Sequence, residues 1–158
     1  VDAAAGHAGG PDDGNSNADR QETGQLYGVE KIIAVLDEMP GDFRIRLSSL
    51  EPAVVNADYV KRLLKYRRLC HHLHLSAQSG SDSVLRDMNR PYDREEYMEI
   101  VDVLRSFDPL YGLSTDIIVG FPGEKEKDFE ESCSLVRECA FCKTHIFTPK
   151  GRSRKRRR

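Results

Sequence analysis

Three short stretches of the chain concentrate hydroxyl, amide, carboxylate and glycine residues that could bind a ligand. They are residues 48–52 (Ser-Ser-Leu-Glu-Pro), 76–82 (Ser-Ala-Gln-Ser-Gly-Ser-Asp) and 120–124 (Gly-Phe-Pro-Gly-Glu). Such groups can hold a ligand with ribose hydroxyls and an amino-acid moiety, and glycines let the backbone approach it closely. Turn and helix-cap residues would give any single stretch the same composition. The prediction of a site therefore depends on all three lying at one edge of the fold.

Each stretch directly follows a segment that the residue pattern predicts to be a strand. The predicted strands are residues 43–48, 73–76 and 115–120, with a fourth at 144–147. The β-branched run at 115–120 is typical of a parallel strand that is buried on both faces. Helices are predicted between the strands, at the following places: from about residue 29 to the Pro40-Gly41 pair, from an Asn56 or Asp58 cap to about Arg68, a short helix capped by Ser81, a longer one capped by Asp93, and 126–138.

Regular alternation of helices with four strands predicts an α/β fold with a parallel sheet. Four such units match half of a (β/α)8 barrel, and they match an open doubly wound sheet equally well. Both architectures put functional residues at the carboxyl ends of the strands, so the three polar stretches would share one edge.

The same strings of residues resemble those of radical-SAM methylthiotransferases. Residues 44–52 are similar to the third barrel strand of that family, residues 72–90 to the fourth strand and its helix, and residues 114–124 to the fifth strand. The likeness runs in order from Tyr27 to Phe147, which makes it far more specific than a lone glycine motif. It implies a partial (β/α) barrel of the radical-SAM type, with about four parallel strands and helices on the outside. Residues 46–52 and 143–147 look most like the branch that acts on N6-threonylcarbamoyladenosine in tRNA, ahead of the isopentenyladenosine and ribosomal-protein branches.

The resemblance also implies a chemistry. Enzymes of this family bind a [4Fe-4S] cluster through a Cys-x3-Cys-x2-Cys loop and cleave S-adenosylmethionine (SAM) to a 5′-deoxyadenosyl radical. Sulfur comes from a second cluster, and a second SAM supplies the methyl group. Expected partners are tRNA and a reductant protein such as flavodoxin or ferredoxin, in the cytoplasm. No membrane partner is expected, since no apolar run approaches the ~20 residues of a membrane span.

Carried over residue by residue, the family site falls on the predicted strand ends. The assigned residues are Ser49 and Glu51 for the methionine and ribose region of SAM, Gln78 and Ser79 for the ribose, Ile118 and Gly120 for the adenine, and Asp116 for the order of the pocket.

The four cysteines do not supply the cluster motif. Cys133, Cys139 and Cys142 are separated by five and two residues, and they fall on a predicted helix and its exit. Cys139 and Cys142 could form half of a zinc site, but ordinary reduced thiols are favoured. His72 and His74 alternate along one strand face and could bind a metal as a pair, although a structural role is favoured.

Composition divides the chain into three parts. Residues 1–22 are rich in Ala, Gly, Asp and Asn and are expected to be disordered, 23–148 form the partial barrel, and 149–158 form a basic tail. The last nine residues hold seven of the 24 basic side chains. The rest of the chain therefore has 17 basic and 26 acidic side chains, so it is much more acidic than the net charge of −2 of the whole chain indicates. The chain is thus expected to be a fragment that is inactive by itself, with unpaired strand edges that lower its solubility. Two other interpretations stay open: a noncatalytic RNA-binding module that uses the basic tail, and another SAM- or nucleotide-using barrel enzyme.

Overall fold

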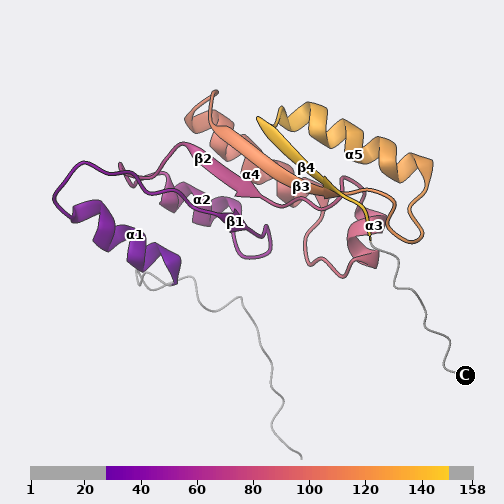
Figure 1. Cartoon of the computed structure of the whole chain (residues 1–158), viewed down its shortest axis with the longest axis horizontal. Coiled ribbons are helices and arrows are strands. Elements are labelled where there is room, and N and C mark those ends of the chain that lie inside the picture. The colour runs from indigo at the N-terminus through magenta and orange to yellow at the C-terminus, as the bar shows by residue number, and fades with distance from the viewer. Residues whose placement is uncertain (1–27, 150–158) are drawn as a thin grey trace, which may run out of the picture.

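Four parallel strands form one sheet, and their order in the sheet is their order in the chain. The computed structural model describes residues 28–149. The strands are β1 (Ser49–Leu50), β2 (His72–Leu75), β3 (Gly112–Ile118) and β4 (Lys143–Phe147). The helices are α1 (Val29–Glu38), α2 (Ala57–Leu63), α3 (Asp82–Asp87), α4 (Arg94–Phe107) and α5 (Glu126–Cys139), as Figure 1 shows. The predicted tail at 1–22 and all of the predicted basic tail at 149–158 except Pro149 lie outside the described residues.

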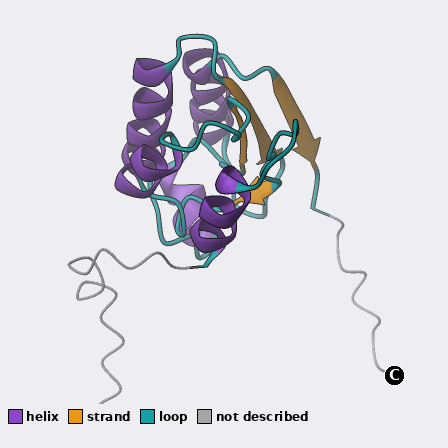
Figure 2. Cartoon of the chain, turned by 90° about the vertical axis from the view of Figure 1, so that its left-hand side faces the viewer, coloured by secondary structure: helices purple, strands orange, loops and turns teal. Residues whose placement is uncertain are grey.

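The helices gather on one side of the sheet, and the other side carries no helix of the described part of the chain (Figure 2). A doubly wound sheet would have helices on both faces and a reversal in strand order. Sequential order with helices on one side is the arrangement of a barrel segment, in which the helix-free face is the inner face. The predicted partial (β/α) barrel is therefore confirmed, and the doubly wound alternative is wrong.

A packed apolar layer joins the sheet to α4. Alternate residues of β2 and β3 point to this side, and α4 meets them with residues at helical spacing. The fully buried members include Leu73, Leu75, Leu113, Tyr97, Ile100 and Leu104. A smaller cluster under α1 consists of Ile33, Ile45, Leu63 and Leu69. The first cluster contains most of the buried apolar residues of the described part of the chain.

The first predicted strand is wrong in position. Residues 43–48 contribute only an isolated bridge between Ile45 and Leu69, and the ladder with β2 begins at Ser49. The alternation correctly identified Ile45 as a buried residue, but a ladder forms only where a neighbouring strand runs alongside. In the parallel register Ser49 lies opposite His74 and Leu50 opposite Leu75, and the residues before Ser49 form no ladder with β2.

Two other boundaries differ from the prediction. β3 begins at Gly112 instead of residue 115, since Gly112 allows close packing: a Cβ there would lie 3.1 Å from His72 Cδ2. The second helix ends at Leu63, before the predicted Arg68. Its cap is Asn56, whose side chain accepts a hydrogen bond from the Tyr59 amide at 2.8 Å.

Buried hydroxyl groups hold the carboxyl end of β2. The Leu75 carbonyl accepts hydrogen bonds from Thr115 Oγ1 at 2.7 Å and from the Tyr97 hydroxyl at 2.9 Å. Thr115 Oγ1 also accepts from the Ala77 amide at 3.0 Å. Burial raises the pKa of Tyr97 far above its usual range, so this hydroxyl stays protonated. The chain therefore leaves β2 along a fixed path toward Gln78.

Candidate functional site

The three polar stretches meet at the carboxyl edge of the sheet. Glu51 follows β1, Gln78 follows β2 and Gly120 follows β3, and these strands are parallel. Gln78 lies directly beside the end of β3, because its amide donates to the Asp116 carbonyl at 2.9 Å and its carbonyl accepts from the Ile118 amide at 2.8 Å. The sequence prediction that these residues share one edge agrees with this register.

The backbone at this edge adopts conformations that leave its surface accessible. Gln78 has a φ of 63°, which costs a non-glycine residue about 1 kcal/mol or more. The two hydrogen bonds to β3 hold it there. Gly120 has a φ of 78°, and a Cβ built on it would meet no atom of residues 28–149 within 4 Å, so these residues leave open space over it. Its amide donates to the Glu124 carboxylate.

Two polar side-chain atoms near the edge have no hydrogen-bond partner within residues 28–149. Glu51 and Arg90 form an ion pair at 2.5 Å. Arg90 Nε and Glu124 Oε1 are buried and make no hydrogen bond in the described part of the chain. Unpaired buried donors and acceptors are costly, so a polar ligand at this edge would gain by pairing with them.

Ser79 lies elsewhere than at the open edge. It is 2% exposed, and its hydroxyl is 3.2 Å from Ser132 Oγ on α5 while it accepts from the Ser81 amide at 3.1 Å. The predicted ribose contact of Ser79 stays a prediction. In the structure this side chain contacts α5.

A buried polar network attaches the 79–83 loop to α5. The Asp128 carboxylate accepts hydrogen bonds from Ser81 and Ser83, each at 2.7 Å. Ser132, one turn further along α5, accepts from the Gly80 amide at 2.9 Å. Ser81 occupies the N-cap position of α3, as predicted, but its hydroxyl donates to Asp128 and makes no cap hydrogen bond to the helix backbone. Sequence reasoning missed this network, although two polar residues at i and i+4 on the buried face of α5 were a visible signal.

The two serine hydroxyls lower the pKa of Asp128 to about 2, from a usual 3.8. Because the folded pKa is depressed, the stabilisation is complete above the unfolded pKa and disappears as pH falls from about 4 to about 2. We expect Asp128→Asn to be less stable than the parent chain at pH 7 and to lose less of its stability across this window. Urea unfolding from pH 6 to pH 2 measures the difference, with Glu130→Gln on the exposed face of α5 as the control. Parallel curves for the parent and Asp128→Asn would contradict the assignment.

A second polar network covers the inner face of the sheet, just below the edge. His74 Nδ1 lies 2.9 Å from Ser114 Oγ, and its Nε2 lies 3.1 Å from Asp116 Oδ2. Ser76 donates to the same Asp116 oxygen at 2.9 Å. His72 lies 3.3 Å from Ser114, and burial together with Arg46 lowers the pKa of His72. The predicted role of Asp116 in ordering the pocket fits these contacts.

The described residues hold no group of three or more His, Cys, Asp or Glu side chains that could bind a metal. Cys139 is buried beside Met98, at 3.5 Å between the sulfur atoms, whereas Cys142 is exposed. Burial raises the pKa of the Cys139 thiol to about 12. Residues 28–149 therefore do not fit an iron–sulfur cluster. They also contain no helix long and apolar enough to cross a membrane.

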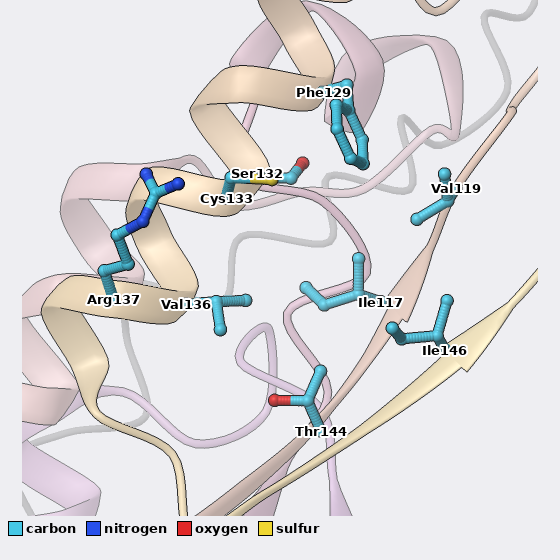
Figure 3. Close-up of a pocket in the computed structure, with 9 residues that line it drawn as sticks. All are labelled: Ile117, Val119, Phe129, Ser132, Cys133, Val136, Arg137, Thr144 and Ile146. Carbon is cyan, nitrogen blue, oxygen red and sulfur yellow. The ribbon is translucent and has the colours of Figure 1, made fainter.

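An apolar groove of about 330 Å³ lies on the helix side of the sheet. Figure 3 shows α5 along one wall and the strands β3 and β4 along the other. The side chains that line it are Ile117, Val119, Phe129, Ser132, Cys133, Val136, Arg137, Thr144 and Ile146. Because β4 is an edge strand of the described sheet, Ile146 is left exposed in this groove.

The chain is similar to known proteins both in its sequence and in its fold. The family profile described as "Radical SAM superfamily" matches residues 16–136. The threonylcarbamoyladenosine tRNA methylthiotransferase of Thermotoga maritima is 48% identical over 119 residues, which are 75% of this chain and 27% of that protein. The protein of the same name from Chlamydia pneumoniae is 39% identical over 126 residues, or 80% of this chain and 30% of the relative.

A tRNA-2-methylthio-N(6)-dimethylallyladenosine synthase of Clostridium botulinum is 41% identical over 117 residues, 74% of this chain and 26% of the relative. The chain thus spans between a quarter and a third of the length of these relatives. Among solved structures, coproporphyrinogen III oxidase (HemN) from Escherichia coli, titled a radical SAM enzyme, superposes with a TM-score of 0.61. It is 20% identical, and the match covers 76% of this chain and 27% of HemN, so this likeness concerns the fold alone. On the match of its profile over most of the described residues, the chain belongs to the radical SAM superfamily.

Proposed function

We propose that this chain is the SAM-binding part of a cytoplasmic tRNA methylthiotransferase that modifies C2 of N6-threonylcarbamoyladenosine. The observation that supports it most is the 48% identity to the Thermotoga maritima enzyme over 119 residues. Because the chain spans only 27% of that relative, the activity, the tRNA substrate and the reductant partner are proposed for a longer protein. The described residues offer no cluster ligands, so the chain alone is expected to bind SAM without turning it over.

The polar edge of the sheet fits SAM in its donors, acceptors and open space. Glu51 and Gln78 would hold the ribose and methionine groups, and Ile118 and Gly120 would line the adenine. The partnerless Arg90 Nε and Glu124 Oε1 support a polar ligand here. When bound, one SAM would supply the 5′-deoxyadenosyl radical, and a second SAM would supply the methyl group. The residues of this chain would bind and orient it, since the hydrogen bonds of Gln78 to β3 and of the 79–83 loop to α5 fix the positions of the edge groups.

A second candidate is the dimethylallyladenosine branch, which the Clostridium botulinum relative at 41% identity represents. It shares the SAM edge, and the two candidates differ only in the group on the target adenine. The inner face of the sheet, which is polar rather than apolar, favours the first candidate.

Titration calorimetry of the 158-residue chain with SAM tests the proposal. We expect Gln78→Ala and Glu51→Gln to weaken binding by about threefold to tenfold each, the effect of losing one hydrogen bond of about 0.5–1.5 kcal/mol. Alanine and glutamine both carry a Cβ, so the substitution leaves the backbone cost of the positive φ at residue 78 about the same. Glu130→Gln, the same chemical change at an exposed site on α5, serves as the control and is expected to bind like the parent chain. Absence of SAM binding, or equal binding by the edge variants and the control, would refute the proposal.

A further inference from the structure

Asp116 presents a fixed acceptor oxygen on the helix-free face of the sheet. Both of its hydrogen bonds, from His74 and Ser76, end on Oδ2. Its Oδ1 has no hydrogen-bond partner among residues 28–149, and the side chain is 23% exposed. Because hydrogen bonds to Oδ2 already fix this carboxylate, Oδ1 can accept an N–H of a ligand without the entropy cost of ordering the side chain.

β4 adds two ring side chains to the same face. In the parallel register His145 lies opposite Asp116, and Phe147 lies opposite Ile118. The His145 ring is 5.8 Å from that of His74 in an edge-to-face arrangement, and its nitrogens have no hydrogen-bond partner in the described part of the chain. Phe147 is 52% exposed at the end of the strand. An exposed aromatic ring at such a position is a surface on which a nucleobase can stack.

The place of β4 in the sheet separates these groups from the SAM residues. The residues assigned to SAM come from β1, β2 and β3 and the turns that follow them. Two reactants must lie side by side, and β4 is the next strand beyond β3. The free rings of β4 thus lie where a second ligand would sit beside SAM, and the free oxygen of Asp116, a residue of β3 that was assigned to ordering the SAM pocket, lies at the boundary between the two.

We propose that Phe147 stacks on the target adenine and that Asp116 and His145 hydrogen-bond the polar substituent on its N6 atom. The proposal rests on the proposed function and deepens it. Asp116 and His145 lie two residues deeper along their strands than Ile118 and Phe147, a distance of about 7 Å that a substituent several bonds long can cross. A carbamoyl group offers N–H donors to Asp116 Oδ1 and an oxygen to His145.

This arrangement selects against a hydrocarbon substituent. A dimethylallyl group would cover Asp116 and His145 without pairing their polar atoms. Sites built to hydrogen-bond a ligand reject analogues that leave buried polar groups unpaired. Stacking on Phe147 does not depend on the substituent, so affinity for the base and choice of substituent are assigned to different residues.

NMR titration of the 158-residue chain with two nucleosides tests the assignment. The probes are N6-threonylcarbamoyladenosine and N6-dimethylallyladenosine, with a parallel titration of SAM. We expect the first nucleoside to shift the ring signals of His145 and Phe147, and to bind at least about fivefold more tightly than the second. Phe147→Ala should weaken both nucleosides by about tenfold, whereas His145→Phe and Asp116→Asn should weaken only the carbamoyl nucleoside. Ile146→Ala, on the opposite face of β4, is the matched control and should change neither affinity.

The SAM arm separates failure of the inference from failure of the proposed function. If SAM binds and either nucleoside leaves His145 and Phe147 unshifted, or Ile146→Ala weakens binding as much as Phe147→Ala, the inference is wrong and the function stands. Equal affinity for both nucleosides overturns the assignment of Asp116 and His145 in the same way. If SAM does not bind either, the proposed function fails and the inference falls with it. Because His145→Phe changes a ring on an edge strand, it tests the assignment even where Asp116→Asn disturbs folding.

Discussion

Gly80→Ala is expected to lower the free energy of unfolding by about 3 kcal/mol, the upper range for an overpacked site. A Cβ at residue 80 would lie 2.6 Å from the Glu131 carbonyl oxygen and 2.6 Å from Ser132 Cα, both backbone atoms of α5. The loop cannot move aside without breaking the bond from the Gly80 amide to Ser132 Oγ. Urea unfolding at pH 7 measures the change.

Gly41→Ala is the control for this substitution. Gly41 has a φ of 116° and only one neighbour, Phe43 Cδ1 at 3.8 Å, so alanine there bears a backbone penalty without a clash. We expect a loss of about 1 kcal/mol for Gly41→Ala. A Gly80→Ala chain as stable as the Gly41→Ala chain would show that the approach of the loop to α5 is looser than the structure indicates.

Leu75→Ala should be the most destabilising truncation of a core residue in β2, by about 3–4 kcal/mol. Leu75 is 0% exposed and lies in the middle of the apolar cluster between the sheet and α4. The shorter side chain removes buried apolar area and leaves a cavity, which neighbours held by strand pairing can fill only in part. Thermal and urea unfolding both report the loss.

The matched control is Leu110→Ala, because Leu110 is 89% exposed in the turn before β3. The same truncation there should change stability by less than about 0.5 kcal/mol. A loss below about 1 kcal/mol for Leu75→Ala would mean that the cluster repacks freely, contrary to its close packing.

Local pattern was sufficient to predict most of the fold. The β-branched run in β3 and the Asp93 cap at α4 are signals carried by neighbouring residues, and both elements formed, although β3 begins three residues earlier than predicted. β1 was misplaced because its two residues are a strand only by virtue of pairing with His74 and Leu75. A local alternation of apolar and polar residues does not show which distant segment a strand will pair with.

The candidate site was predictable in its location and less so in its contacts. Parallel strand ends had to share an edge, so Glu51, Gln78 and Gly120 could be grouped from sequence. Ser79 and Ser81 look the same as ligand-binding serines in the sequence, but their hydroxyls meet α5. The partners of those hydroxyls lie 53 and 47 residues away, and no spacing rule connects them.

The attachment of the 79–83 loop to α5 has a consequence for the order in which the domain assembles. Ser79 belongs to the second strand unit, whereas Ser132 belongs to the helix after the third. The polar edge of the sheet can therefore reach its final form only after α5 has been synthesised and has packed against the sheet. We therefore expect this edge to form late and cooperatively in folding, although Glu51 and Gln78 precede α5 in the chain.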